Sequence, residues 1–414
     1  MKKYFILATA ALVALTACSK VETDNAPAQK ITFQAANYVP QTKASSVFAD
    51  FPEFKSRAFL HAEGVDLDAN GAVNGTSYQE FFGDSGETVS PYNSSDAKIT
   101  SPTTATNNVS YWAPSHEYYW PKGTKSFVNF IGWYGTDGTN AVNPTISYAY
   151  TSSKWTATMV WNFSNSTVGA AGANLLYADM AWRYNSNPTA TYGENGLSSG
   201  YNKGVPMLFH HALAQINVKA YATAATAETG EPANTALTAG SSNTVTDGNA
   251  TWTIKLTDVK ITPVYTSGTL TLTNQDKGST GTQEWSGDWA AASGATAGDL
   301  ALTSGTEVPV NQIAKPAASG TDGDVIAKTC VVPQSLGATV VLSFNLDITT
   351  TYSNVSNHEI IPVSIKLNDM GTSAWVLNTK YTYYLNINPS QKVVRFDPAL
   401  AEDWVTGSTT DQTI

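Results

Sequence analysis

Short stretches in which apolar and polar residues alternate run through the whole chain, and this period of two predicts β-strands. The clearest stretch runs from Val340 to Ile348, where every even-numbered side chain is large and apolar. Residues 381–388 alternate in a similar way near the C-terminus. Clusters of Gly, Asn, Asp, Ser and Pro separate the stretches, and no amphipathic helix stands out. Many short strands of this kind predict an all-β chain of sandwich domains.

Two further patterns refine this prediction. Residues 252–256 alternate regularly, and the alternation then slips by one position before Val259. A slip of one residue is typical of a β-bulge, in which two residues of one strand oppose one of the next. Phe127–Tyr134 is apolar on both faces, which predicts a strand in the middle of a sheet.

Composition sets outer limits on what the protein does. The 414 residues give room for two or three domains. Hydrophobic residues make up 42% of the chain, enough for a packed core, so a wholly disordered chain is excluded. Charged residues make up only 14%, and the net charge is −10. An acidic chain of this kind lacks the Lys and Arg surplus that binds nucleic acid or an anionic membrane surface.

The N-terminus has the pattern of an export signal. Lys2 and Lys3 precede an apolar run of 13 residues, Tyr4–Thr16, which is shorter than the about 20 residues of a membrane-spanning helix. The run leads to Leu15–Cys18, with small residues directly before the cysteine. This segment resembles the lipobox of bacterial lipoproteins, which implies that residues 1–17 are removed and that Cys18 carries the lipid. The alternative is an ordinary secretory signal with a cysteine there by chance.

A lipid on Cys18 leaves Cys330 as the single free thiol among the two cysteines, so no intramolecular disulfide is expected. Cys330 lies in an apolar run ending at Pro333. A buried, unreactive core cysteine is therefore the favoured interpretation. A nucleophilic thiol would need a base or a positive field close by, and Lys328 is the one candidate in the local sequence.

Two motifs match functional patterns only in part. Residues 196–200 read Gly-Leu-Ser-Ser-Gly, but the nucleophile elbow of hydrolases needs a strand before Ser198 and a helix after it, and the flanks read as loop. Asp66–Gly71 matches the first half of a calcium-binding loop, but Ser77 stands where a bidentate Glu is needed. A hairpin turn with Asn70-Gly71 at its tip is favoured there. A hydrolase and a weak calcium site remain the alternatives.

The adjacent pair His210 and His211 invites a metal interpretation. Neighbouring residues of a strand point to opposite faces, so these two side chains cannot readily bind one ion together. Structural roles are favoured for both. With no paired C-x-x-C, H-E-x-x-H or phosphate-binding loop in the chain, we expect no cofactor, no metal and no enzymatic activity.

The chain is rich in aromatic residues, with 11 Trp and 20 Tyr. Most are expected to fill the core. An alternative is that some stack on sugar rings, for which Trp285 and Trp289 are the candidates because they lie in the Gly- and Ser-rich stretch 274–300, which reads as a surface loop. On this alternative, the protein is a cell-surface glycan-binding lipoprotein that never polymerises.

Several segments, in order along nearly the whole chain, resemble the fimbrillin family of Bacteroidales, the subunits of type V pili and their Mfa-like relatives. They include a short strand followed by a basic residue, a Tyr-Trp-Pro motif with an aromatic strand after it, and a Phe-x-His-Ala-Leu strand in mid-chain. The segments are Ile31–Ala35, Gln41–Ala44, Tyr118–Pro121, Phe127–Tyr134, Leu176–Asp179, Leu208–Ile216, Val332–Gln334, Tyr381–Leu385, Phe396–Pro398 and Trp404.

The resemblance implies a fold and a mechanism. The fold is two tandem transthyretin-like β-sandwich domains behind a lipoprotein signal peptide. A trypsin-like surface protease removes the first strand of the exported lipoprotein. An extended segment of another subunit then fills the groove, where its backbone forms hydrogen bonds and its alternate side chains plug the core. The implied partners are other fimbrial subunits, the protease, and the outer membrane through the lipid anchor, with no nucleic acid.

The residues at the expected place suit this mechanism. Ile31, Phe33 and Ala35 lie on one face of an alternating segment, so they would plug a sandwich. The family site carried over to this chain falls between Lys43 and Ala44, although an Arg is common where Lys43 stands. Arg57 and Ala58 are the runner-up, but they lie within what reads as the next core strand.

The resulting prediction is a structural or adhesive subunit of a type V-like fimbrium at the cell surface. Its host or bacterial ligand, and its position as stalk, anchor or tip subunit, do not follow from the sequence. The expected segments are a signal peptide (1–17), a polar tether (18–30), an N-terminal sandwich (31–205) with a removable first strand (31–43), and a C-terminal sandwich (206–414).

Overall fold

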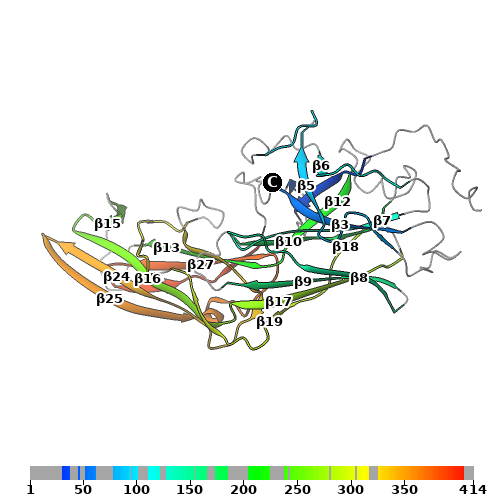
Figure 1. Ribbon diagram of the computed structural model, residues 1–414. Helices are drawn as coiled ribbons and strands as arrows, with labels where there is room; N and C mark the ends of the chain where they lie inside the picture. Colours follow the sequence, from blue (N-terminus) through cyan, green and yellow to red (C-terminus); the bar gives the residue numbers. More distant parts are fainter. Residues whose placement is uncertain are drawn as a thin grey trace, which may run out of the picture.

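The computed structural model is all-β, as the alternation predicts, and its strands form two bodies that lie end to end (Figure 1). Apart from the 3₁₀ segment η4 (Leu367–Met370), the described residues contain no helix. Among the residues that the structure describes, no helix is long and apolar enough to cross a bilayer. The structure describes residues 30–37, 45–46, 52–61, 78–93, 95–100, 111–121, 127–152, 154–165, 173–184, 204–223, 237–240, 243–278, 281–303, 305–316 and 325–404.

The first body contains a closed ring of strands. Its order is β7-β10-β12-β1-β6-β5-β3, and β3 pairs back onto β7. The ring strands are β1 (Phe33–Asn37), β3 (Phe54–His61), β5 (Glu87–Tyr92), β6 (Tyr111–Pro114), β7 (Phe127–Thr136), β10 (Asn174–Ala178) and β12 (Val205–His211). The same sheet includes β2 (Ser45–Ser46), β4 (Gln79–Glu80), β11 (Met180–Tyr184) and β18 (Gly281–Gln283).

A four-stranded sheet packs against one side of this ring. Its strands are β8 (Thr145–Thr151), β9 (Lys154–Ser164), β17 (Ser267–Gln275) and β19 (Trp289–Ala291). The two layers enclose a core that includes Trp155, Trp161 and Trp182, each fully buried. β7 contributes Phe130 to the ring interior and Ile131 to this second core, so the predicted strand with two buried faces is confirmed.

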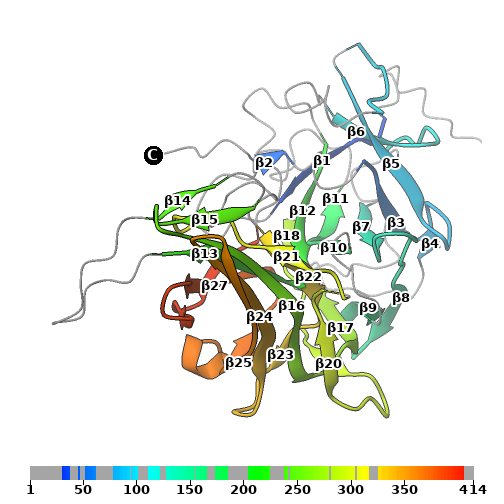
Figure 2. The ribbon, with the colours of Figure 1, turned by 90° about the vertical axis from the view of Figure 1, so that its left-hand side faces the viewer.

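The second body is a sandwich of two sheets (Figure 2). One sheet contains β13 (Ala214–Ala222), β22 (Val325–Val331), β27 (Thr379–Asn388), β28 (Val393–Phe396) and β29 (Leu400–Asp403). The other contains β14 (Thr238–Ala239), β15 (Thr244–Thr246), β16 (Ala250–Val264), β20 (Gly298–Ala301), β21 (Val308–Pro309), β24 (Val341–Tyr352) and β25 (Val355–Lys366). A small pair, β23 (Gln334–Ser335) and β26 (Ala374–Trp375), completes the strands.

The sequence patterns fit this second body closely. In β24 the even-numbered residues Leu342 to Ile348 are buried against the opposite sheet, as predicted. The predicted bulge lies in β16, whose register with β24 shifts between Thr257 and Lys260. Asp258 takes the extra position with φ of 52°, so Leu256 and Val259 both face the core although they are three residues apart.

The chain does not divide between the bodies at one point. β12 begins at the expected boundary of 205/206 but closes the ring of the first body. Directly after β16, the chain returns to the first body, where β17 pairs with β9 from Ser267 opposite Ser164 to Gln275 opposite Thr156. Strands of the expected C-terminal segment are therefore part of the N-terminal body, a long-range pairing that local sequence patterns do not encode.

A buried ion pair ties this returning segment to the first body. The Arg183 Nη2 donates to the Asp276 Oδ2 at 2.6 Å, and the two side chains are only 8% and 1% exposed. The Asp276 amide also donates to the Trp155 carbonyl oxygen at 2.9 Å. Both charges are desolvated, so each depends on the other for compensation.

We expect Asp276→Ala to lower the free energy of unfolding by about 3–5 kcal/mol, because it leaves the Arg183 guanidinium buried without its partner. Glu307→Ala is the matched control, since Glu307 pairs with Lys255 at the surface, and should cost less than about 1 kcal/mol. Urea denaturation followed by tryptophan fluorescence measures both. Equal losses would contradict a structural role for the buried pair.

Candidate strand-exchange site

The predicted removable strand, β1, is one of the seven strands that form the closed ring. β1 runs parallel to β12, with Phe33 opposite Val205, and antiparallel to β6, with Phe33 opposite Trp112. Just before β1, the Ile31 amide donates to the Tyr118 carbonyl oxygen at 2.8 Å. The Val205 amide donates to the Thr32 carbonyl oxygen at 2.8 Å on the other side. Backbone hydrogen bonds therefore hold this segment along both edges.

The inward side chains of the same segment plug the ring. Ile31 is 1% exposed and Phe33 is fully buried. The Phe33 ring meets Phe54 and Phe130 edge-on, with centroids 5.8 and 5.4 Å away, and Phe82 at 6.2 Å. Ala35 is partly buried at the border of this core. The three residues predicted to face the core therefore do so.

A glycine allows the backbones to approach. A Cβ built on Gly204 would lie 2.7 Å from the Phe33 carbonyl carbon and 2.9 Å from its Cα, closer than real Cβ atoms come to backbone. Any side chain at 204 would therefore push β1 away from the start of β12.

Removal of β1 would open the ring. β12 and β6 would lose their common neighbour, and the aromatic pocket around Phe33 would face solvent. An unpaired edge beside an uncovered apolar row is a template for an extended segment. The arrangement is therefore suited to binding a replacement strand.

The expected cleavage site lies where a cut would free this strand. Ala36 of β1 pairs with Ser46 of β2, and Asn37 pairs with Ser45. Lys43 and Ala44, between the two strands, lie outside the described residues. So do Cys18, Ser198 and the Asp66–Gly71 motif.

The runner-up cleavage site is buried within a central strand. Arg57 and Ala58 lie in β3, paired with Ile131 and Phe130 of β7. Ala58 is fully buried, and the Arg57 guanidinium is held by Glu80 through two hydrogen bonds of 2.7 and 2.9 Å. A protease needs an extended, accessible segment, so cleavage here requires β3 to leave the sheet.

The candidate glycan-binding tryptophans do not form an exposed platform, which corrects the expectation for residues 274–300. Trp285 is 8% exposed and its indole N–H donates to the Ala178 carbonyl oxygen at 2.8 Å. Trp289 begins β19, packs against the same core, and donates to the Ala212 carbonyl oxygen at 2.6 Å. Their indole N–H groups satisfy buried carbonyls of the first body.

The paired histidines have separate structural partners. The His210 Nε2 lies 2.8 Å from the Asp179 Oδ1. The His211 ring stacks on Trp404 with centroids 3.9 Å apart, and its Nδ1 lies 3.0 Å from the Asn174 Oδ1. The described part of the chain contains no group of three His, Cys, Asp or Glu residues arranged to hold a metal ion.

Cys330 is a core residue. Its side chain is fully buried in β22, and its thiol donates to the Ala173 carbonyl oxygen at 3.0 Å. Burial raises the pKa of the thiol to about 12, so the nucleophilic thiolate is not formed near neutral pH.

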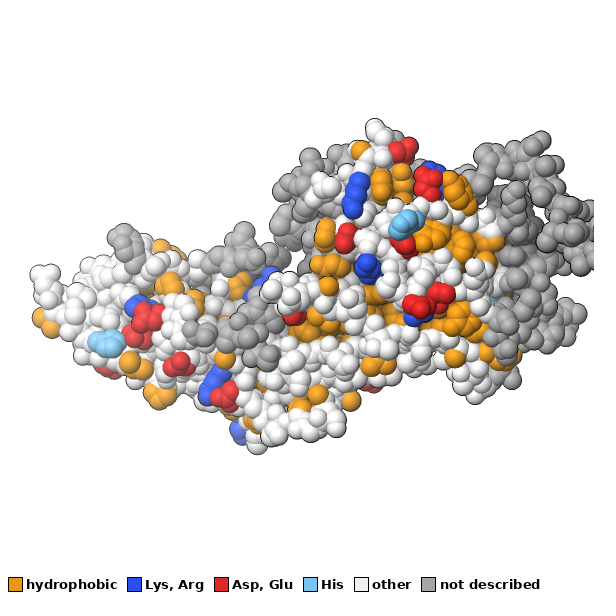
Figure 3. Space-filling model, in the orientation of Figure 1, with side chains coloured by type: hydrophobic (Ala, Val, Ile, Leu, Met, Phe, Trp, Pro, Cys, Tyr) orange, Lys and Arg blue, Asp and Glu red, His pale blue; other side chains and the backbone are white. Residues whose placement is uncertain are grey.

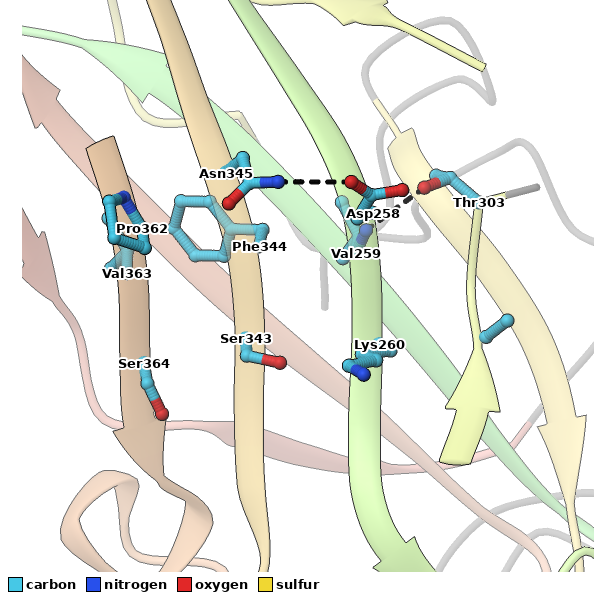
Figure 4. Close-up of a pocket in the computed structure, with 11 residues that line it drawn as sticks. Asp258, Val259, Lys260, Thr303, Ser343, Phe344, Asn345, Pro362, Val363 and Ser364 are labelled. Atoms are coloured by element: carbon cyan, nitrogen blue, oxygen red, sulfur yellow. Dashed lines mark hydrogen bonds between the residues drawn. The ribbon is translucent and has the colours of Figure 1, made fainter. Parts of the chain in front are cut away.

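A hollow in the second body is lined by both polar and apolar residues (Figure 4). It lies beside the bulge, where the Asn345 amide donates to the Asp258 carboxylate at 3.0 Å and the Val259 amide donates to the Thr303 hydroxyl at 3.1 Å. Its lining lacks an aromatic platform for a sugar, because Phe344 is turned into the core. β1 is therefore the candidate site that the sequence and the fold share.

The sequence patterns do not identify three residues that lie beside Phe33: Trp112 of β6, Phe82 and Gly204. Trp112 lies in the short alternation Tyr111–Pro114, which is one signal of a strand. No local pattern places these residues beside Phe33, because they are distant in the sequence.

Comparisons with known proteins return structural neighbours only. No protein-family model matches the chain, and no curated protein matches it. A candidate cell adhesion protein from Bacteroides uniformis is 13% identical, with a TM-score of 0.42, over 91% of this chain and 98% of that one. One from Bacteroides ovatus is 12% identical, with a TM-score of 0.38, over 92% and 99%. The fimbrial anchor protein Mfa2 from Porphyromonas gingivalis is 7% identical, with a TM-score of 0.23, over 91% and 98%.

Two of these neighbours are described as cell adhesion proteins and one as a fimbrial anchor protein. At such identities and scores they carry no argument about activity, so the functional inference rests on this chain's own residues.

We expect Phe33→Ala to lower the free energy of unfolding by about 3–5 kcal/mol, because it leaves a cavity among Phe54, Phe82 and Phe130. Thr145→Ala, at an exposed position of β8, is the control and should change it by less than about 0.5 kcal/mol. Chemical denaturation gives both values. A small loss for Phe33→Ala would mean that β1 does not support the ring.

Buried His61 makes stability depend on pH. Its Nε2 lies 2.8 Å from the Tyr148 hydroxyl oxygen, and its ring stacks on Phe127. Burial, and then the nearby Arg183 charge, lowers the His61 pKa to about 3. The unfolded chain, with a histidine pKa of about 6.5, therefore binds one more proton between about pH 6.5 and 3, and the stability contributed by neutral His61 is lost as the pH falls through that window.

We expect His61→Gln to reduce the slope of unfolding free energy against pH, between pH 5.5 and 4, by about 1.4 kcal/mol per pH unit. Tyr148→Phe removes the same hydrogen bond but no group that titrates in this range, so its slope should match that of the unaltered protein. Urea titrations at several pH values measure both. Identical slopes for all three proteins would mean that His61 is protonated in the folded state.

Proposed function

We propose that the protein is a structural or adhesive subunit of a surface fimbrium. It is exported as a lipoprotein that carries its lipid on Cys18. A trypsin-like protease cuts between Lys43 and Ala44, and a segment of another subunit replaces β1. The observation that carries the proposal is that β1 closes the ring, held by its backbone on both edges and by Ile31 and Phe33 inside.

The cut acts as the trigger because of the local concentration of β1. While the chain is intact, β1 competes for its groove at an effective concentration in the range of about millimolar. A strand on another molecule cannot match this at low concentration. After cleavage β1 is a separate fragment, and once it leaves it is diluted away.

Cleavage would also change the attachment of the protein. Cys18 and β1 both precede Lys43 in the sequence, so one cut separates the lipid and the first strand together from the rest. Release from the membrane anchor and opening of the groove would therefore be coupled. A subunit that is not cut would keep both its lipid and its closed ring.

The surface described by the structure suits adhesion more than electrostatic binding. On the face that Figure 3 shows, several Lys or Arg side chains lie beside Asp or Glu side chains, and hydrophobic side chains gather over the first body. Tyr78 and Tyr119 in this body are 39% and 40% exposed. The net charge of −10 disfavours steering toward anionic partners.

The deciding experiment is N-terminal sequencing and intact-mass measurement of the protein from its native cell surface. We expect a chain that begins at Ala44 and carries no lipid. Lys43→Gln should keep the full chain lipidated and prevent its incorporation into fibres, because the cleavage site then lacks the basic residue that a trypsin-like protease recognises.

Lys30→Gln is the matched control, since Lys30 pairs with Glu117 at the surface and lies before the strand. It should be processed normally. A native protein that begins at lipidated Cys18 would overturn assembly by cleavage and leave an uncleaved surface lipoprotein.

A further inference from the structure

We propose that the β1 groove selects its incoming strand by an aromatic side chain at the position of Phe33, two residues after an aliphatic one. This inference rests on the proposed strand exchange and specifies its partner: an extended segment of another protein chain with the spacing aliphatic, any residue, aromatic. The segment 405–414 of this chain does not have that spacing.

The pocket around Phe33 is built for an aromatic ring. Four rings meet there, since Phe33 contacts Phe54, Phe82 and Phe130 with centroids 5.4–6.2 Å away and interplanar angles of 70–90°. These edge-to-face arrangements add attraction beyond the buried area. A smaller side chain in the incoming strand would leave an unfilled cavity.

The position of Ile31 differs from that of Phe33. Ile31 is 1% exposed in the same core cluster as Phe33, and its amide donates to the Tyr118 carbonyl oxygen. An aliphatic residue fills this position, and an aromatic ring exchanged into it would be overpacked. The order of the two residues therefore matters as well as their presence.

Gly204 adds a steric requirement on the acceptor side. Its missing Cβ leaves room for the strand backbone at Phe33. Because the contact is with backbone atoms, it applies to any strand that takes this place. Gly204 acts as a positioning residue for whichever segment enters.

The segment after β29 does not meet the requirement. Residues 405–414 contain no aromatic residue, and in an extended strand the large apolar side chains of Val405 and Ile414 would lie on opposite faces. In residues 393–404, Val394 and Phe396 have the spacing, but β28 pairs with β27 and both side chains pack on the second core. Neither of these two segments therefore supplies the required strand in this fold.

The test uses the full-length chain with a site-specific protease sequence placed at 43–44. After cutting, fluorescent peptides are exchanged into the groove and their affinities compared. The peptides are residues 30–37, the same with Phe33→Ala, the same with Ile31 and Phe33 exchanged, and residues 405–414.

We expect residues 30–37 to enter. Phe33→Ala should weaken binding by at least about 100-fold, and the exchanged peptide by at least about 10-fold despite its identical composition. Residues 405–414 should not enter. Gly204→Ala should weaken binding of the 30–37 peptide by at least about 10-fold, whereas Gly298→Ala, with open space around its Cβ position, should not.

Equal binding of the 30–37, Phe33→Ala and exchanged peptides would overturn the aromatic selection, as would entry of 405–414. Failure of residues 30–37 themselves to enter the cut protein would instead overturn strand exchange at β1. The two failures are therefore distinguishable.

Discussion

The first body depends on the closure of its ring by a short strand near the N-terminus. β1 provides the link between β12 and β6, so each of these strands has two neighbours only while β1 is present. Phe33 adds the central ring of an aromatic cluster drawn from three other segments. Backbone pairing and side-chain burial are thus concentrated in one short segment. In the proposed mechanism, the loss of this strand would leave an acceptor site.

The second constraint is the return of the chain from the second body to the first. β16 belongs to the second sandwich, and β17 pairs along its whole length with β9. The buried Arg183–Asp276 pair and the indole bonds of Trp285 and Trp289 fix this returning segment. Trp404 and Cys330 also lie in the core of the first body. Residues from both halves of the chain therefore build the four-stranded layer beside the ring. This layer does not contain β1, so the removal of β1 would leave its strand pairings in place.

Sequence patterns anticipated local structure well and tertiary neighbours poorly. The alternation of β24, the bulge at Asp258 and the doubly buried β7 all follow from periods of two within a few residues. The same reasoning placed Ile31 and Phe33 on the plugging face. It interpreted 274–300 as a surface loop and named Trp285 and Trp289 as candidates for the glycan-binding alternative, whereas their indole N–H groups donate to buried carbonyls. It also expected one domain boundary at 205/206, whereas β12, β17, β18 and β19, which follow this point in the sequence, belong to sheets of the first body.

The all-β class, the faces of the main strands and the side chains that β1 places in the core all follow from the sequence, because they depend on the two-residue period of an extended chain. Which strands became neighbours depended on how the whole chain folds. Trp112, Phe82 and Gly204 surround Phe33 although they are about 50 to 170 positions away. Such pairings are selected by how whole sheets close and pack, and a period of two carries no information about which distant strand lies alongside.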